Sequence, residues 1–240
     1  MKLIKPSYQI LTPINGEEIL KAIELAARTC YQSEGKIEIE NEDDSGFPVL
    51  KGYAKSARIL IPKLMNLNHE AMLEFGGMIT VRFIVDRGVS HELVRHRVAS
   101  FAQESTRYCN YSKDEHISFI IPPWINDTLN ETYKYHKDID WFQSTEDIAA
   151  STANWLQCIA WCESNYNTLL LNGWTPQQAR SVLPNSLKTE INVSANIREW
   201  RHIFKLRTAK AAHPQMREVM QPLLDEFKIL IPLLFDDINY

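Results

Sequence analysis

The chain has 240 residues, of which 23% are charged and 45% belong to the hydrophobic set. Such a chain is long enough for one sizeable core and too apolar for intrinsic disorder, so we expect a single domain over residues 1–240. The formal net charge of -4 disfavours general binding to nucleic acid, because affinity for a polyanion depends on neutralising many phosphates.

The cysteines and the apolar runs indicate a protein of the cytoplasm. The four cysteines (Cys30, Cys109, Cys158 and Cys162) form neither a disulfide framework nor a C-x-x-C metal motif, so we expect reduced thiols. Charge and proline interrupt the first six residues, and no window approaches the length of a membrane span. We therefore expect neither targeting nor membrane partners.

The first third of the chain predicts two helices on either side of a polar segment. Asn15 and Glu18 form an Asn-x-x-Glu start, and the periodic apolar residues after it predict a helix that ends near Cys30. Residues 33–55 are polar and acidic, which indicates a surface excursion, with room for a short hairpin. A second helix is expected over residues 57–67, where proline 62 must lie in the first turn or kink the helix.

The middle of the chain predicts a strand and a short helix. Residues 78–86 alternate between apolar and polar side chains, as in a half-buried strand. Ser90 is a candidate N-cap for a helix that carries His91 to Arg95, which would place the following arginines at the helix end. Residues 117–121 form a short apolar run before two prolines, which predicts a buried strand.

A long helix is expected to begin at Ser144-x-x-Asp147 and to end at Asn172-Gly173. Large side chains recur along it at helical spacing. This stripe could face a flavin or a partner, but core packing is the favoured interpretation. Its members are Trp155, Ile159, Cys162 and Tyr166.

Three further elements are predicted after this helix. Thr175-Pro176-Gln177-Gln178 combines a capping box with proline at the first helical position, and the short helix would deliver Arg180. Residues 189–195 alternate as a second strand. This strand runs into a third cap, Asn196-x-x-Glu199, and a helix that carries Arg198 and Arg207.

Residues 95–107 gather an unusual number of hydrogen-bond donors and charges. Arginine binds phosphate oxygens through two parallel hydrogen bonds, so this run suits the phosphate of a nucleotide. A solvated basic turn that pairs with the acidic excursion remains open as the alternative. The run contains Arg95, His96, Arg97, Ser100, Gln103, Glu104, Ser105, Thr106 and Arg107.

Helical geometry, if it continued through the first arginines, would separate their directions. Residues two apart on a helix point about 200° away from each other. Arg95 and Arg97 would then address different ligands, and one motif could serve two sites.

Several other kinds of site are disfavoured. His91-Glu92 begins a zinc-protease-like motif, but Arg95 stands where the second histidine ligand is needed, so we expect no metal. No glycine-rich dinucleotide fingerprint and no P-loop is present. Ser105 with His96 could act as nucleophile and base, yet the Gly-x-Ser-x-Gly elbow is absent.

Residues 95–107 fit the pattern R-H-R-x-x-S-x-x-x-x-S-x-R, which resembles the signature of the flavin-dependent thymidylate synthases. The resemblance extends from about residue 26 to residue 218. Further elements recur in the family's order: Ala27-Arg28, His69 with Glu74, Arg180 before Val182-Leu183-Pro184, Asn196-x-Arg198, and Leu206-Arg207.

The resemblance implies an α/β (α+β) fold in which an antiparallel sheet packs against helices. It also implies a homotetramer whose active sites form where subunits meet. The implied reaction is the methylation of dUMP to dTMP, with FAD as cofactor, NADPH as reductant and methylenetetrahydrofolate as carbon donor.

The resemblance also assigns roles by position. The residues expected to bind dUMP are Glu92, Arg95, Gln103, Glu104, Ser105, Thr106, Arg107, Arg180 and Arg207. The residues expected to bind FAD are His69, Ala71, Arg95, His96, Arg97, Gln103, Asn196, Arg198 and His202. Arg207 is expected to be catalytic, because a guanidinium at the uracil edge would favour ionisation at N3 and prepare C6 for hydride.

Some positions depart from the family pattern. Ala71 stands where Ser or Thr is common, Phe75 where His is common, and His202 where Asn is common. The cysteine-dependent thymidylate synthases use a cysteine that follows a proline, and no cysteine here does so.

The competing hypothesis is a non-catalytic protein that binds a nucleotide or RNA on the same scaffold.

Overall fold

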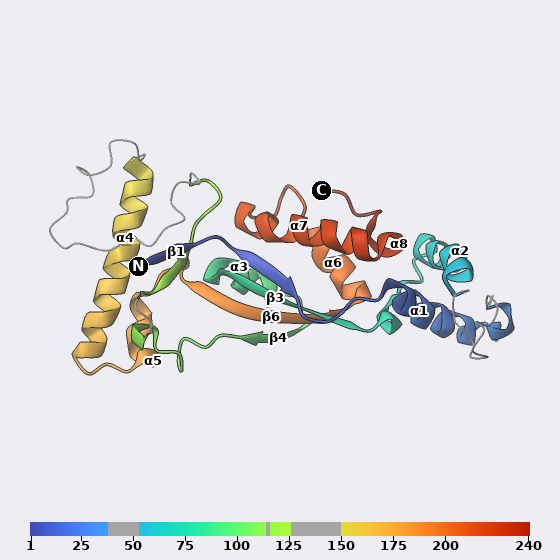
Figure 1. Ribbon diagram of the computed structural model, residues 1–240, viewed down its shortest axis with the longest axis horizontal. Helices are drawn as coiled ribbons and strands as arrows, with labels where there is room; N and C mark the ends of the chain where they lie inside the picture. The colour runs from blue at the N-terminus through green and yellow to red at the C-terminus, as the bar shows by residue number, and fades with distance from the viewer. Residues whose placement is uncertain (38–52, 114–115, 126–149) are drawn as a thin grey trace, which may run out of the picture. The chain divides into compact units, whose positions relative to one another are not determined.

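The computed structural model describes residues 1–37, 53–113, 116–125 and 150–240 (Figure 1). The predicted acidic excursion lies largely outside the described residues, as does the predicted start of the long helix at Ser144. In chain order the elements are β1 (Lys2–Ile4), β2 (Ser7–Ile10), α1 (Gly16–Cys30), η1 (Glu34–Lys36), α2 (Tyr53–Asn66), η2 (Glu70–Gly76), β3 (Met78–Asp86), α3 (Arg87–Leu93), β4 (Ser100–Gln103), η3 (Tyr111–Lys113), β5 (Ser118–Ile120), α4 (Ala150–Leu171), α5 (Pro176–Ala179), η5 (Arg180–Val182), β6 (Lys188–Asn196), α6 (Ile197–Arg207), α7 (Pro214–Leu230) and α8 (Pro232–Phe235).

The main sheet has four strands in the order β2-β3-β6-β4 and is flanked by helices. The sheet is antiparallel, which confirms the expected fold class. Side-chain contacts follow the antiparallel register: Thr80 Oγ1 lies 3.0 Å from Ser194 Oγ, and Arg82 Nε lies 3.0 Å from Glu190 Oε2. Residue 80 of β3 contacts residue 194 of β6, and residue 82 contacts residue 190, so the two strands run in opposite directions.

The chain divides into two compact units. Unit 1 comprises Met1–Tyr8, Arg82–Arg95 and Phe101–Asn192, and unit 2 comprises Gln9–Val81, His96–Ser100 and Val193–Tyr240. Four of the five boundaries fall within strands β2, β3, β4 and β6, so each of these strands supplies residues to both units. The fifth lies between Arg95 and His96, after the end of α3.

The core of unit 1 forms around a parallel pair of strands. Leu3 of β1 pairs with Phe119 of β5, and both are buried. Helix α4 packs its buried face on the same core (Figure 1). Ile159 and Tyr166 belong to this core and Trp155 packs against it, so three of the four side chains in the stripe predicted along α4 serve packing. Burial of such apolar surface is the main stabilising term of the unit.

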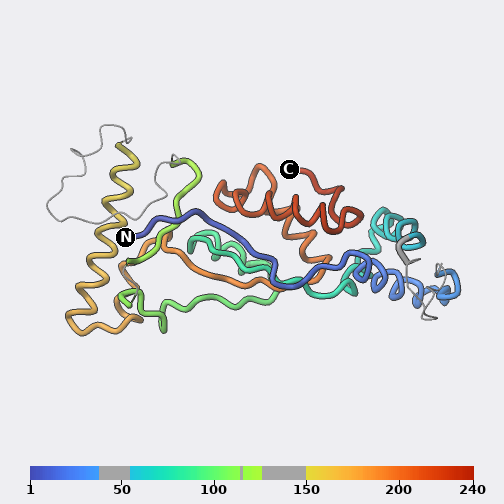
Figure 2. Tube along the Cα trace, viewed as in Figure 1, coloured from blue at the N-terminus to red at the C-terminus, as the bar shows by residue number. Residues whose placement is uncertain are grey.

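The core of unit 2 is an aromatic cluster. Trp200 and Phe204 of α6 pack against Phe227 of α7, and Phe235 of α8 completes the group, with ring centroids 5.1 to 5.8 Å apart. Figure 2 shows these three helices together at the red end of the chain. The indole Nε1 of Trp200 donates to the carbonyl of Ile79 at 3.0 Å, which ties α6 to β3. Helix α6 is therefore held rigidly, and it carries several of the predicted site residues.

Gly76 allows η2 to approach its neighbours closely. A Cβ atom at this position would lie 2.7 Å from Ile197 and 3.1 Å from Ile19, so only glycine fits between α1 and α6. Gly77 follows with φ of 84°, a backbone conformation that glycine adopts at no steric cost. The two glycines thus set the path of the segment that leads from η2 into β3.

Most predicted boundaries are confirmed. The Asn15 side chain accepts from the N–H of Glu18 at the start of α1, and β3 spans the predicted residues. Helix α2 begins earlier than expected, and Pro62 lies in its interior instead of its first turn. Gly173, with φ of 87°, follows the end of α4 as expected.

Two local predictions around α3 are wrong. The N-cap is Asp86, whose carboxylate accepts from the N–H of Val89 at 2.7 Å, and Ser90 lies inside the helix. The helix ends at Leu93, so helical geometry does not continue through Arg95 and Arg97. Both arginines follow the helix end, as expected, but the 200° argument for their directions does not apply.

No helix among the described residues combines the length and the apolar character that crossing a bilayer requires. All four cysteines are described, and all are free thiols.

Candidate functional site

The predicted site residues divide between the two units by role. Most of the predicted dUMP ligands belong to unit 1: Glu92, Arg95, Gln103, Glu104, Ser105, Thr106, Arg107 and Arg180. Most of the predicted FAD ligands belong to unit 2: His69, Ala71, His96, Arg97, Asn196, Arg198 and His202, together with Arg207.

In unit 1 the turn after β4 contacts the short helix α5 and the 3-10 helix η5. Arg180 Nη1 donates to Thr106 Oγ1 at 3.0 Å, and Arg107 Nε donates to Gln177 Oε1 at 3.0 Å. The capping box holds this helix start, because the N–H of Thr175 donates to Gln178 Oε1 at 2.9 Å. These contacts orient Arg107 and Arg180, two exposed arginines that lie far apart in the sequence. Two oriented guanidinium groups on neighbouring segments suit an anionic ligand.

Gln103 is oriented by two hydroxyl groups. Its Nε2 donates to Ser90 Oγ at 2.9 Å and to Thr189 Oγ1 at 3.2 Å. These two contacts account for both hydrogens of the amide nitrogen. A ligand contact by this side chain would therefore use the carbonyl oxygen.

Glu104 belongs to an ionic network on β6. Its Oε2 lies 3.0 Å from Lys188 Nζ and accepts from the N–H of Glu190 at 3.2 Å. Lys188 Nζ also lies 2.7 Å from Glu190 Oε1. Burial alone would lower the pKa of Lys188, but its hydrogen bonds to Glu190 and Glu104 outweigh that effect and raise it. The network fixes the end of β4 against β6, so Glu104 positions the turn that follows.

The remaining unit 1 residues lie around the same turn. Ser105 Oγ accepts from the N–H of Arg107 at 3.3 Å, which is a turn contact of a kind that serine often makes. Glu92 is partly buried at the end of α3, and Arg95 is exposed two residues after the helix end.

In unit 2, His96 lies between a carboxylate and a guanidinium. Its Nδ1 is 3.3 Å from Glu199 Oε1, and its Nε2 accepts from Arg207 Nε at 2.9 Å. The ring of His202 makes an edge contact with that of His96, with centroids 5.6 Å apart and planes at 75°. His96 and Glu199 are buried, whereas Arg207 is partly exposed.

Burial governs the charge state of this group. Burial, together with the neighbouring charges of Arg207 and His202, lowers the pKa of His96 to about 4. Burial also raises the pKa of Glu199, against the influence of His202 and Arg198. His96 is therefore a neutral imidazole at physiological pH, and both its nitrogens are engaged.

This arrangement removes His96 as a base for Ser105. A general base needs a nitrogen lone pair directed at the hydroxyl, and the one lone pair of this neutral ring faces Arg207. The nucleophile hypothesis therefore loses its base. It also limits contact between His96 and a flavin, because a ring nitrogen could bind the flavin only by giving up one of its two present contacts.

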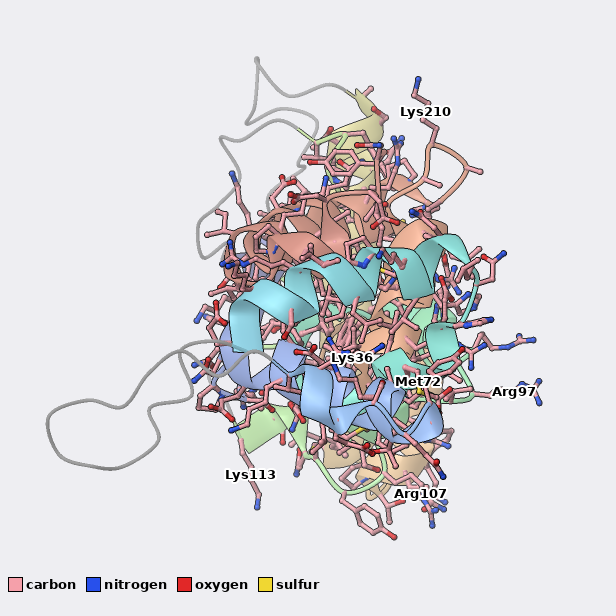
Figure 3. All side chains as sticks on the ribbon, turned by 90° about the vertical axis from the view of Figure 1, so that its right-hand side faces the viewer. Lys36, Met72, Arg97, Arg107, Lys113 and Lys210 are labelled. Carbon is pink, nitrogen blue, oxygen red and sulfur yellow. The ribbon has the colours of Figure 1, made fainter. Side chains whose placement is uncertain are left out.

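The other predicted FAD ligands lie on surfaces of unit 2. Arg97 is exposed and extends away from the chain (Figure 3). Arg198 Nη1 lies 2.7 Å from Glu74 Oε1, with both side chains about half exposed, so the two residues quoted together for the resemblance are in contact. Asn196 caps α6 by accepting from the N–H of Glu199 at 2.9 Å. His69, Ala71 and His202 are exposed.

The group of His96, Glu199 and His202 also has the spacing of a metal site. One ligand atom from each lies within 4.8 Å of the others. The positive Arg207 side chain, however, already occupies the Nε2 lone pair of His96, and a cation beside it would be repelled. We assign no metal to this group.

Glu199 is the residue that the sequence analysis missed. Its position three residues after Asn196 suggested a cap partner, and the cap does use its backbone N–H. Its side chain instead contacts His96, which is 103 positions away. The only available signal was its spacing on the helix, where Glu199, His202 and Arg207 fall near one face.

Comparison with known proteins places the chain in a family. The family model for thymidylate synthase complementing protein matches residues 15–233. The chain is 30% identical over 216 residues to a flavin-dependent thymidylate synthase of Geobacter sulfurreducens, covering 90% of this chain and 80% of that protein. Proteins of the same name from Corynebacterium glutamicum and Mycobacterium tuberculosis are 28% and 27% identical, covering 94% and 98% of this chain and 81% and 85% of theirs.

Solved structures show the same fold. The UMP/dUMP methylase PolB from Streptomyces cacaoi, bound with 5-Br UMP, superposes with a TM-score of 0.69 at 21% identity, covering 98% of this chain and 95% of that chain. The same methylase bound with 5-Br dUMP gives a TM-score of 0.67 at 22% identity, covering 98% and 96%. The resemblance found in residues 95–107 is confirmed, and the chain, an enzyme of the methyltransferase class, belongs to the family of thymidylate synthase complementing proteins.

Proposed function

We propose that this chain is a flavin-dependent thymidylate synthase, which converts dUMP to dTMP with FAD as cofactor, NADPH as reductant and methylenetetrahydrofolate as carbon donor. The observation that carries the proposal is the contact of Arg207 Nε with His96 Nε2 at 2.9 Å. It links the last arginine of α6 to the signature, 111 positions earlier in the chain, as a shared site would require.

The proposed dUMP site uses the cationic turn of unit 1. Arg107 and Arg180 present guanidinium groups from neighbouring segments, and each is oriented by a side-chain contact, with Gln177 and Thr106 respectively. Such preset guanidinium groups bind a phosphate at lower entropic cost than mobile ones. In this proposal they hold the 5′-phosphate of dUMP. The other proposed dUMP ligands of unit 1 are Glu92, Arg95, Gln103, Glu104, Ser105 and Thr106.

The donor set of unit 2 fits a flavin dinucleotide. Exposed Arg97 and Arg198 can neutralise a pyrophosphate, and the imidazole of His202 offers a ring surface and a polar edge. His69, Ala71, His96 and Asn196 complete the unit 2 part of the proposed set, and Arg95 and Gln103 are the proposed flavin ligands in unit 1. When bound and reduced, the flavin would supply the hydride that C6 of the uracil ring receives.

Arg207 is the proposed catalytic residue. Its Nε–H donates to His96, while its two terminal nitrogens carry the other four donors of the guanidinium. Facing the uracil edge, these donors would stabilise negative charge on the ring during attack at the carbon donor. The enzyme would need no covalent nucleophile, and Ser105 would act as a hydrogen-bonding ligand.

The assembly follows from the same proposal. A homotetramer with active sites shared between subunits would bring the unit 1 and unit 2 sets of different copies into one site. We propose residues 1–240 as one domain of that tetramer, working in the cytoplasm without nucleic acid or membrane partners.

Purified protein tests the function directly. It should be yellow after purification or after addition of FAD, and it should release tritium from C5-labelled dUMP in the presence of NADPH and methylenetetrahydrofolate. A protein that binds dUMP or RNA but takes up no flavin and oxidises no NADPH would instead support the non-catalytic hypothesis.

A further inference from the structure

The group around His96 determines which nitrogen of this imidazole carries the proton. Arginine has only donors, so the lone pair on His96 Nε2 must accept from Arg207 Nε, 2.9 Å away. His96 is neutral at physiological pH and carries a single ring proton. That proton must then lie on Nδ1, which is directed at Glu199 Oε1 at 3.3 Å.

The position of the Glu199 side chain suits the contact with His96 Nδ1. Its backbone N–H is held by the Asn196 side chain at 2.9 Å, so the first turn of α6 is fixed. Its side chain is 9% exposed, and a buried carboxylate needs a hydrogen-bond donor. The imidazole Nδ1–H meets that need, and the edge contact with His202 fixes the plane of the ring.

We infer that Glu199 is a positioning residue, which holds His96 as the Nδ1–H tautomer and thereby directs the guanidinium of Arg207. This inference rests on the function proposed for Arg207. If His96 took the other tautomer, its Nε2–H would oppose the Nε–H of Arg207, because two donors would then face each other. The carboxylate of Glu199, by keeping the proton on Nδ1, thus keeps Nε2 of His96 as the acceptor for Arg207.

The expected effect falls on turnover more than on binding. Glu199→Ala leaves Nδ1–H without its acceptor, so both tautomers become populated and Arg207 loses the constant acceptor that His96 Nε2 provides for its Nε–H. We expect kcat for dTMP formation to fall on the order of tenfold, the worth of one buried hydrogen bond, with a smaller rise in the KM for dUMP, because Arg207 is one of several proposed dUMP ligands. Glu199→Gln should retain more turnover than Glu199→Ala, because the amide oxygen can still accept from Nδ1–H.

Asp237→Asn is the matched control. Asp237 Oδ2 pairs with Arg201 Nη2 at 2.6 Å, so this variant also removes a carboxylate contact of α6, outside the group around His96. It should lower stability and leave kcat at the wild-type value. A loss of kcat equal to that of Glu199→Ala would show that any weakened contact of α6 has this effect, and the inference would be wrong.

A spectroscopic measurement tests the tautomer without any turnover. In protein labelled with ¹⁵N-histidine, the wild-type His96 should show a pyrrole-type Nδ1 and a pyridine-type Nε2, assigned by comparison with His96→Gln. Glu199→Ala should shift both resonances toward intermediate values. A wild-type Nε2–H tautomer, or a folded Glu199→Ala protein with wild-type shifts and wild-type kcat, would overturn the inference.

A second pair of variants decides the matter if Glu199→Ala does not fold. The carboxamide of His96→Gln reaches the Nε2 position and can accept from Arg207, whereas that of His96→Asn reaches only the Nδ1 position. Higher kcat in the glutamine variant supports the inference, and equal or higher kcat in the asparagine variant contradicts it. Wild-type protein that bound no flavin would refute the proposed function, while the histidine resonances would still decide the tautomer.

Discussion

The buried imidazole of His96 should make folding stability depend on pH in a defined window. Its pKa is lowered from 6.5 to about 4, mainly by burial. The unfolded chain therefore takes up a proton at this residue before the folded chain does. The contribution to stability is fully present above pH 6.5 and is lost as the pH falls toward 4.

The size of the effect follows from the two pKa values. Between pH 7.5 and pH 5 the unfolded imidazole becomes almost fully protonated while the folded one stays mostly neutral, so the free energy of unfolding should fall by about 2 kcal/mol. Comparison with His96→Gln isolates the contribution of His96, because that variant keeps the neighbouring side chains and loses only this imidazole ring.

Urea unfolding at the two pH values measures this difference. The wild type should lose about 2 kcal/mol more than His96→Gln between pH 7.5 and pH 5. His91→Gln, which removes an exposed imidazole from α3, is the control and should behave as the wild type does. An equal loss in the wild type and in His96→Gln would refute the argument that burial keeps His96 neutral.

Three further predictions concern activity. Arg207→Ala should bind flavin almost normally and lose dTMP formation by roughly 10² to 10³-fold, measured as turnover under saturating dUMP; equal turnover would place uracil activation elsewhere. Ser105→Ala should keep partial activity, since the hydroxyl accepts a turn N–H at 3.3 Å, and complete loss with intact dUMP binding would restore the nucleophile hypothesis. Arg180→Ala, which removes the contact with Thr106, should weaken dUMP binding roughly tenfold in a titration while the flavin spectrum stays unchanged.

Periodic and capped segments could be predicted from sequence because their determinants are local. The alternation of residues 78–86 and the Asn15 cap both appear in the structure as expected. Strands β1 and β4 have three and four residues, too few for alternation to be distinguished from chance, and neither was predicted. Their pairing depends on partners far along the chain, such as Phe119 opposite Leu3.

The predicted start of α3 was wrong because two residues near it have side chains that can cap a helix. Asp86 and Ser90 are both good N-cap types, and the alternation of residues 78–86 assigns Asp86 to the end of the strand. In the structure Asp86 ends β3 and also caps α3, so strand and helix meet without a loop. Ser90 then becomes a buried hydroxyl that orients Gln103, a role with no local signature.

The composition of the signature run follows from its path between the two units. Arg95 belongs to unit 1, residues 96–100 to unit 2, and residues 101–107 to unit 1 again. A motif that supplies both units needs more than one arginine, because each unit requires its own cationic group for its own proposed ligand. The helical geometry from which two sites were expected ends at Leu93, before the arginines. The alternation of the chain between the units gives a physical reason to expect two sites. It also places His96, the buried member of the Arg95-His96-Arg97 run, in the same unit as Glu199 and Arg207, which it contacts.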